Sequence, residues 1–426
     1  MRLRPGDHER FARARNDRRR ISGGNHKNHV IAAQPRPFSQ DAKSRITARA
    51  QAIGFDLVGI ASAEPFVDEQ RTLCERRDRG YLDHWRYPDD LIARICDPAI
   101  SLPGARSIIC TATAYASRDA PHAPYAPGLR GAVSAHAWGR DYHRVIGGRL
   151  QELAAFIGSE YPDERCLACV DTGPLPERAA AVRAGIGWFG KSGNVLTKRF
   201  GSYVLLGEII TTLALEPDRP LLTHCGNCED CIPACPTGAI QPDGAVDATR
   251  CISDLTQYKG AIPRALRKAI GNRLWGCDTC QTDCRVNARS RPAADGSFRP
   301  LPEVGTSMDL PAVLRMTKSQ FREWFGPTSM GWRGKAVLQR NAAVALGNSR
   351  DERAIPHLVA ALSDRKPLVR GHAAWALGEF GGDSARAALT ALLHREGDAW
   401  VREEAELALR GPETGTTDRQ LGKELT

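Results

Sequence analysis

The stretch CGNCEDCIPACP at residues 225–236 places four cysteines at the spacing C-x2-C-x2-C-x3-C and follows the last with a proline. Thiols this close together either form disulfides or bind metal. A chain of 426 residues can bury enough apolar surface without disulfides. Its basic, polar N-terminus does not resemble an export signal, and no apolar run approaches the length of a membrane span. We therefore expect a cytoplasmic protein without membrane contacts, whose clustered thiols serve metal or redox chemistry.

A second group of cysteines follows downstream, as Cys251 and a C-x2-C-x3-C triplet at 277–284. In bacterial ferredoxins, three thiolates of a C-x2-C-x2-C-x3-C-P run bind one [4Fe–4S] cluster and the fourth binds a second. By this logic the sequence predicts two clusters, the first bound by Cys225, Cys228, Cys231 and Cys284, and the second by Cys235, Cys251, Cys277 and Cys280. A zinc site, the alternative, uses pairs of cysteines, often with histidine, and does not need the triplet.

The other five cysteines lie apart from these runs. Cys74, Cys96 and Cys110 are isolated, and Cys166 and Cys169 form a lone C-x2-C without a partner pair nearby. Free cysteines within strands behave as small buried hydrophobes. We expect these five to be core residues rather than ligands.

Iron–sulfur clusters relay electrons, so another group should carry out the chemistry. The preceding region contains neither a G-x-G-x-x-G after a strand nor a phosphate-binding loop. Instead, VDTGPLPERAAAVRAGIGWFGKSGNVL places Asp171 where an expected strand ends in a Gly-Pro turn, before a helix and a glycine-rich loop. Two interpretations are open: Asp171 faces a cavity as a functional carboxyl group, or it only caps the turn.

The elements around Asp171 follow from hydrophobic periodicity. Residues 44–62 predict a helix that stops at Gly54 and then a strand, and residues 105–115 and 201–213 predict two more strands. Residues 141–160 predict an amphipathic helix, and residues 164–191 predict a strand, a loop and a helix. Alternating strands and helices indicate an α/β or α+β domain.

The C-terminal region contains a repeat. RNAAVALG (340–347), RGHAAWALG (370–378) and REEAELALR (402–410) recur at intervals of 31 to 32 residues. This pattern predicts stacked helix pairs of the HEAT-like kind, which commonly offer an interaction surface, although a plain helical cap is the alternative. The expected domains are a basic disordered tail (1–38), a catalytic domain (39–215), a two-cluster domain (216–300), a repeat domain (301–412) and a polar tail (413–426).

The charge balance points to an anionic partner. The formal net charge is +10 and the isoelectric point is near 9.1. A basic protein of this kind is suited to nucleic acid, although a solvated surface with a basic tail gives the same totals.

Several stretches occur together and in order: DTGPLPERAAAVRAGIGWFGKSGNVL, the double cysteine pattern, RCISDLTQYKG, GNRLWGCDTCQTDC and the repeats. From about residue 40 to 410, this combination resembles the epoxyqueuosine reductase family. The resemblance implies a cobalamin-binding α/β (α+β) domain, a ferredoxin-like domain with two [4Fe–4S] clusters and a HEAT-like domain that contacts tRNA. It also implies a reaction, the reduction of the epoxide of epoxyqueuosine at the tRNA wobble position to queuosine.

The same resemblance implies roles for residues and partners. Asp171 would protonate the departing oxygen, with its pKa raised by desolvation near the corrin ring. The implied cobalamin contacts are Arg94, Asp171, Lys191, Ser192, Asn194, Val195, Ser253, Cys277 and Asp278. The expected partners of the monomer are a tRNA with a GUN anticodon and an external electron donor of the flavodoxin, ferredoxin or reductase type.

Three stretches depart from the family pattern. Arg285-Val286 stands where Pro-Trp usually follows the last cysteine, Ser192 to Val195 stand where N-T-L-L is usual, and Asp254 replaces an aromatic residue. These departures leave two alternatives open. One is a cobalamin-dependent reductase of the reductive-dehalogenase type with another substrate, and the other is a non-catalytic iron–sulfur electron-transfer protein.

Overall fold

The computed structural model of the protein describes residues 40–117 and 128–411, and the predicted tails at 1–38 and 413–426 lie outside the described residues. The elements before the cysteine-rich segment are α1 (Gln40–Ile53), β1 (Leu57–Ser62), α2 (Val67–Asp78), α3 (Asp89–Cys96), α4 (Pro98–Ser101), β2 (Ser107–Ala114), β3 (Arg130–Val133), α5 (Tyr142–Glu160), β4 (Cys166–Cys169), α6 (Glu177–Arg183), β5 (Trp188–Phe189), β6 (Val195–Leu196) and β7 (Val204–Thr211). The strands and helices predicted between residues 44 and 213 are confirmed.

Four of these strands form one sheet in the order β1-β2-β7-β4, and every pairing is antiparallel. In this register, Cys110 on β2 and Cys169 on β4 both lie opposite Glu208 on β7. An α/β fold requires parallel strands joined by crossover helices. The α+β class is therefore right and the α/β alternative is wrong.

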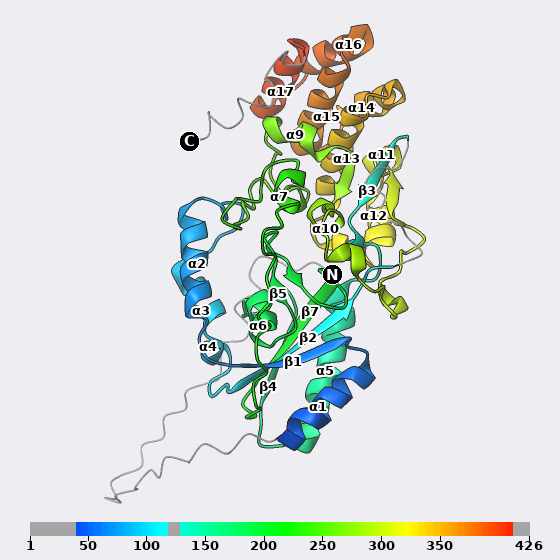
Figure 1. Cartoon of the computed structure of the whole chain (residues 1–426). Helices are drawn as coiled ribbons and strands as arrows, with labels where there is room; N and C mark the ends of the chain where they lie inside the picture. The colour runs from blue at the N-terminus through cyan, green and yellow to red at the C-terminus, as the bar shows by residue number, and fades with distance from the viewer. Residues whose placement is uncertain (1–39, 118–127, 412–426) are drawn as a thin grey trace, which may run out of the picture. The chain divides into compact units, whose positions relative to one another are not determined.

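Helices cover both faces of this sheet, with α1 and α5 on one side and α6 on the other (Figure 1). Successive strand residues point to opposite faces. Ile109 and Ile209 therefore belong to the core formed with Ile146 and Leu150 of α5. Their neighbours Ile108 and Ile210 belong to a second core, with the alanines of α6.

A glycine sets how closely α6 approaches the sheet. A Cβ on Gly59 would stand 2.2 Å from the carbonyl oxygen of Ala184, at the end of α6. Only glycine permits this contact. The tight packing fixes α6 and thus the loop at 170–176 that precedes it.

The cysteine-rich segment has only short elements: α7 (Cys231–Ala234), α8 (Ile252–Leu255), α9 (Arg264–Ile270), β8 (Arg273–Trp275) and α10 (Thr279–Thr282). A second sheet, in the order β8-β3-β9, includes β9 (Ser307–Asp309). Strand β8 pairs with β3 in parallel, and β9 pairs with β3 antiparallel. Strands from three distant parts of the chain thus join the cysteine-rich segment to the elements on either side of it.

The C-terminal region consists of helices: α11 (Leu310–Arg315), α12 (Lys318–Phe325), α13 (Lys335–Ser349), α14 (Ile355–Ala361), α15 (Pro367–Phe380), α16 (Gly382–Leu393) and α17 (Ala399–Leu409). Helices α13, α15 and α17 carry the three repeated motifs and pack in succession (Figure 1). A Cβ on Gly347 would stand 2.8 Å from Cβ of Ala376, and one on Gly378 would stand 2.7 Å from Cβ of Ala408. The small residues of the repeat are therefore what allows these helices to approach so closely.

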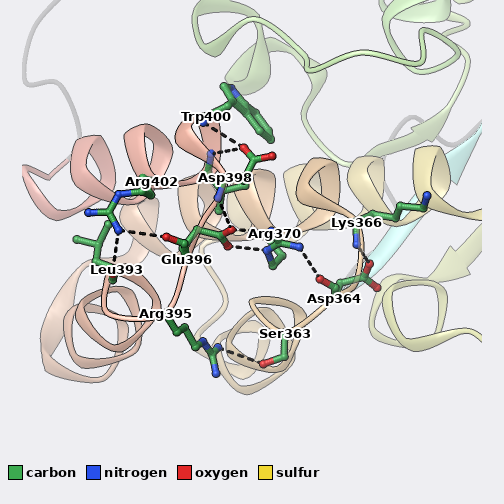
Figure 2. A network of polar contacts seen from close by, with 11 residues as sticks. Ser363, Asp364, Lys366, Arg370, Leu393, Arg395, Glu396, Asp398, Trp400 and Arg402 are labelled. Atoms are coloured by element: carbon green, nitrogen blue, oxygen red, sulfur yellow. Dashed lines mark hydrogen bonds and ion pairs between the residues drawn. The ribbon is translucent and has the colours of Figure 1, made fainter.

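Successive repeats are also joined by polar contacts, which Figure 2 shows. Arg370 Nε and Nη2 donate to the Glu396 carboxylate at 2.6 and 2.7 Å, and Arg370 Nη1 donates to the Asp364 carbonyl oxygen at 2.9 Å. Asp398 caps α17 by accepting from the backbone N–H groups of Trp400 and Val401. Within the described ranges, no helix has the length and apolar character needed to cross a membrane.

Candidate active site

Asp171 lies just after β4, in a left-handed backbone conformation with φ of 54°. This conformation is uncommon for residues other than glycine and is tolerated best by asparagine and aspartate. The Asp171 backbone N–H donates to Glu177 Oε2 at 3.0 Å. Its carboxylate oxygen Oδ2 accepts from Tyr142 Oη at 3.1 Å and lies 3.0 Å from His143 Nε2. The side chain therefore reaches the start of α5, and the interpretation of Asp171 as only a turn cap is wrong.

His143 lies between two carboxylates. Its Nδ1 is 2.8 Å from Asp141 Oδ1, and its Nε2 is 3.0 Å from Asp171 Oδ2. Asp141 is held in place because it also caps α5, accepting from the His143 backbone N–H. A neutral imidazole has one N–H, whereas an imidazolium can donate to both carboxylates. The geometry therefore favours a protonated His143.

The pKa directions agree with this geometry. Desolvation lowers the pKa of His143, but its hydrogen bonds to Asp141 and Asp171 outweigh that effect and raise the pKa to about 9. Desolvation raises the pKa of Asp171, yet the contacts with His143 and Tyr142 lower it overall. Desolvation thus acts in the expected direction, but the net pKa shift of Asp171 is downward, because a cationic partner sits against the carboxylate. The raised pKa expected beside a bound corrin ring stays a prediction.

Two more carboxyl groups lie near Asp171. Burial, followed by the charge of Asp171, raises the pKa of Glu177 to about 7. Glu208 is 1% exposed, and burial followed by the charges of Glu177 and Asp171 raises its pKa well above the usual range. Its Oε1 has no hydrogen-bond partner among the described residues. Because these carboxyl groups are buried and close together, it is unfavourable for all of them to be ionised at once.

Asp171 lines a cavity of about 1020 Å³. Its wall includes the loop at 171–178, the side chains of Trp85 and Arg94, and Phe189, which is 46% exposed although it is a large apolar residue. Gly190 and Gly193 also line it, so the backbone borders the cavity there without a side chain. A cavity of this size, with apolar surface and a few polar groups, has the features of a site for a large ligand.

The residues expected to contact cobalamin do not all meet at this cavity. Arg94 and Asp171 line it. Lys191 Nζ pairs with Glu229 Oε1 at 3.0 Å, and the backbone oxygen of Ser253 accepts from Thr256. Val195 is buried in β6.

The remaining expected contacts face the cluster segment. Asn194 Nδ2 donates to Ser192 Oγ at 3.2 Å and lies 3.7 Å from Cys280 Sγ. Cys277 and Asp278 border a separate cavity of about 40 Å³. There the Asp278 carboxylate accepts from Ser134 Oγ at 2.6 Å and from the Ala135 N–H at 2.8 Å. These residues place the glycine-rich loop beside the cysteines.

The cysteines of the two predicted sets approach one another. Burial raises the pKa of Cys231, and the negative charges of Cys225, Cys284 and Cys228 raise it further. Burial likewise raises the pKa of Cys280 well above its usual value, followed by the charges of Cys277 and Cys251. Residues 40–117 and 128–411 contain no group of three Cys, His, Asp or Glu side chains placed to hold a single metal ion.

All thirteen cysteines are free thiols, so the chain has no disulfide staple. Cys96, Cys110 and Cys169 are buried, as expected for core residues. Cys74 and Cys166 are only half-buried and pack against the edges of the cores.

Sequence reasoning missed Tyr142, His143, Glu177 and Glu208. The partners of Asp171 on α5 lie 28 and 29 residues before it, and only folding brings them together. The D-Y-H start of α5 held one available signal, since an aspartate before a helix is a typical N-cap.

Comparison with known proteins identifies three matching families. The family described as "Epoxyqueuosine reductase QueG, DUF1730" matches residues 96–172. A 4Fe-4S double cluster binding domain matches residues 224–287, and HEAT repeats match residues 334–410.

Similar whole proteins extend the comparison. The chain is 41% identical over 373 residues to an epoxyqueuosine reductase of Bacillus cereus, covering 87% of this chain and 97% of that protein. A crystal structure of epoxyqueuosine reductase with a tRNA-Tyr epoxyqueuosine-modified stem loop matches with a TM-score of 0.82 and 39% identity, over 87% of this chain and 98% of that one. The Bacillus subtilis enzyme, solved with an aspartate catalytic loop swung out of its active site, matches with the same TM-score and coverage at 38% identity.

Proposed function

Because the chain belongs to the epoxyqueuosine reductase family, we propose that it reduces epoxyqueuosine at the wobble position of tRNA to queuosine. One observation carries this proposal: the identity of 41% extends over 97% of a curated epoxyqueuosine reductase. The similar structure with a modified tRNA stem loop supports RNA as the substrate.

The chemistry requires both electrons and protons. Converting an epoxide to an alkene consumes two electrons and two protons and releases one water. Side chains can hold and move the protons, whereas the electrons require redox centres. An external donor of the flavodoxin, ferredoxin or reductase type supplies the electrons, and the iron–sulfur clusters relay them.

The cluster ligands follow the ferredoxin arrangement. Cys225, Cys228, Cys231 and Cys284 bind one [4Fe–4S] cluster, and Cys235, Cys251, Cys277 and Cys280 bind the other. The charges of Cys225, Cys228 and Cys284 act on the thiol of Cys231, which supports the first set. The charges of Cys251 and Cys277 act on the thiol of Cys280, which supports the second. The match of residues 224–287 to a double-cluster domain supports both.

The cavity beside Asp171 fits cobalamin. Its volume of about 1020 Å³ is at the upper end for small-molecule sites. Phe189 would offer cobalamin an exposed apolar face, Gly190 and Gly193 would let a broad ring approach the backbone, and Arg94 would supply a cation for its phosphate group. Bound cobalamin supplies a cobalt centre that becomes a strong nucleophile when reduced.

Asp171 and His143 handle the proton. The departing oxygen must be protonated, because an alkoxide is a poor leaving group. With a pKa of about 9, His143 holds a proton at neutral pH, and its Nε2 lies 3.0 Å from Asp171 Oδ2. Asp171, ionised at the cavity wall, takes this proton from His143 and passes it to the oxygen as the C–O bond breaks, which supplies one of the two protons that the reaction consumes. Tyr142 orients the carboxylate through its hydroxyl group.

The substrate RNA and the cellular setting complete the proposal. A net charge of +10 suits a polyanionic partner. The specific element is the anticodon loop of a tRNA with a GUN anticodon, because single-stranded bases can be unstacked into a pocket. The protein acts as a cytoplasmic monomer.

Conversion of the modified nucleoside tests the function. The protein, reconstituted anaerobically with iron, sulfide and cobalamin, is incubated with a reductant and an epoxyqueuosine-modified stem loop, and the nucleosides are analysed by mass spectrometry. We expect queuosine to form, and to form only with cobalamin present. A protein that binds its iron but never converts the stem loop would instead fit the electron-transfer alternative.

Iron content tests the cluster assignment. We expect about eight iron atoms per chain, from two four-iron clusters. Replacing Cys231 with serine should remove about half of this iron, since it deletes a ligand of one cluster. Cys169→Ser, a substitution of a buried cysteine outside both sets, serves as the matched control and should leave the iron content unchanged. Equal iron loss in both variants would show that the ligand sets are wrong.

A further inference from the structure

A stack of two indoles and a guanidinium begins at the cavity wall, and the proposed function gives it no role. The rings of Trp85 and Trp332 lie 6.4 Å apart at an interplanar angle of 18°. The guanidinium carbon of Arg333 lies 3.4 Å from the centroid of the Trp332 ring and 4.6 Å from that of Trp85. We call Trp85, Trp332 and Arg333 the aromatic ledge.

The ledge is built from two distant segments and is held in place. Trp85 comes from the loop after α2, and Trp332 ends the short helix at Ser329–Trp332 that precedes α13. Asp254 anchors the first segment, because its carboxylate accepts from Trp85 Nε1 at 2.5 Å and also contacts His84 Nδ1. His84 in turn stacks on Tyr258 at 4.0 Å. Asp254 thus fixes the orientation of Trp85.

Two groups of the aromatic ledge, the ring of Trp332 and the Nε of Arg333, are not fully used by contacts within the fold. Trp332 is 54% exposed, unusual for the largest apolar side chain. Arg333 Nε is buried and has no hydrogen-bond partner within the described part of the chain. Desolvation lowers the pKa of Arg333 to about 10, so it remains a cation at neutral pH. A ligand that offers a flat π face and a hydrogen-bond acceptor would satisfy both groups.

The ledge also adjoins the reaction site. Trp85 lines the same cavity as Asp171, and its ring stacks with that of Trp332. Arg86 follows in the cavity wall and adds an exposed cation. The nearest acidic group, Asp254, is already occupied by Trp85 and His84. A ligand that entered the cavity with one unit would place its neighbouring unit near the ledge.

We propose that the aromatic ledge stacks a nucleobase of the single-stranded RNA loop, adjacent to the nucleotide that enters the cavity. This inference rests on the proposed function and names a part of the substrate that the protein grips outside the reaction site. Exposed aromatic faces and arginine planes are what proteins use to hold unstacked bases, and base carbonyls and ring nitrogens accept from an N–H such as Arg333 Nε. A cation over the ring suits the adjoining phosphate as well.

Binding of a fluorescently labelled anticodon stem loop tests the ledge. Trp332→Leu keeps an apolar side chain but removes the π face, and Trp332→Phe keeps the face. Since stacking on one aromatic residue commonly accounts for a few kcal/mol per base, we expect Trp332→Leu to weaken affinity by about 5- to 100-fold. Trp332→Phe should recover most of that loss. Leu222→Ala, a change at a fully exposed apolar residue, is the control and should bind as the unaltered protein does.

A stem loop with an abasic site identifies the gripped base. The unaltered protein should lose affinity when the base next to the wobble position is removed, and Trp332→Leu should show little further loss with that RNA. Independent, additive losses would overturn the proposal. Loss of bound cobalamin from Trp332→Leu with unchanged RNA affinity would also overturn it and assign the ledge to the cofactor.

The outcomes separate this inference from the proposed function. Queuosine formation by the unaltered protein, together with normal RNA affinity in Trp332→Leu, would remove the ledge and leave the function standing. Trp332-dependent RNA binding without any conversion of epoxyqueuosine would keep the ledge and remove the function.

Discussion

Two regions of this protein contain buried ionisable groups in contrasting arrangements. In one region opposite charges are paired, and in the other carboxyl groups lie close together. Where the repeats meet the cysteine-rich segment, Glu404 of α17 accepts from Arg267 Nη1 and Nη2 at 2.8 and 2.6 Å, and the side chains of the pair are 2% and 4% exposed. Arg264 contacts the same carboxylate. Arg340 of α13 donates to the carbonyl oxygens of Tyr258, Gly260 and Leu255. Each of these charged side chains is held by direct hydrogen bonds or ion pairs.

Around Asp171, carboxyl groups lie close to one another. Asp171, Glu177 and Glu208 influence one another, and Glu208 Oε1 has no hydrogen-bond partner in the part of the chain that the structure describes. His143 is shared between Asp141 and Asp171. Asp171 also sits in a left-handed conformation that costs conformational energy.

This difference between the two regions distinguishes charges that stabilise the fold from charges that can take part in proton transfer. A buried ion pair with good geometry holds two elements together, and losing one partner leaves a charge stranded. Carboxyl groups forced together have displaced pKa values, which is what proton transfer needs. Substitutions that remove a charge should therefore affect activity in the cavity and stability at the repeats.

The largest effect should come from Asp171→Asn. Asparagine is the same size and tolerates the left-handed backbone, so the loop should keep its shape. It cannot transfer a proton, and we expect turnover of the modified stem loop to fall by roughly 10²- to 10⁴-fold. Iron content, cobalamin loading and RNA affinity should stay near those of the unaltered protein.

Two other outcomes for this variant would change the role of Asp171. Full activity of Asp171→Asn would remove the carboxylate from the mechanism. Loss of cobalamin from the variant would make Asp171 a binding residue instead.

At the repeats, removing one partner of the buried ion pair should lower the free energy of unfolding. The loss should be comparable to the rise in the activation barrier expected for Asp171→Asn. Glu404→Ala leaves Arg267 buried without its carboxylate, and we expect the free energy of unfolding to fall by about 3–5 kcal/mol. Chemical denaturation followed by circular dichroism measures this. Glu403→Ala changes the exposed neighbour on the same helix and should cost far less. Equal losses from the two variants would mean that the ion pair adds no stability beyond helix packing.

The same contrast explains what could be predicted from the sequence. Spacing alone identified the cysteine runs and the repeats, because both are local patterns along the chain. Asp171 was found from a local motif, but its partner His143 comes from another element, and the sign of its pKa shift depends on that partner. The role of Asp254 was also hidden, since Trp85 lies 169 residues away from it in the chain. Antiparallel pairing was left open because periodicity does not report strand direction.

The most direct test of the crowded carboxyl groups concerns Glu208, where we expect a gradual change with pH. A raised folded-state pKa means that the folded protein holds a proton which the unfolded chain releases. Its contribution to stability is therefore fully present below the unfolded pKa and is lost as pH rises toward the folded one. The glutamine of Glu208→Gln cannot titrate. As pH rises from about 5 to 8, the free energy of unfolding of the variant should therefore increase relative to that of the unaltered protein, by at most ~1.4 kcal/mol per pH unit for one proton. Thermal unfolding across this range measures the difference, with the exposed Glu303→Gln as a control that should run parallel to the unaltered protein. Parallel curves for Glu208→Gln would mean that this carboxyl group is ionised in the fold, and the cavity would then need a cation that pairs with it.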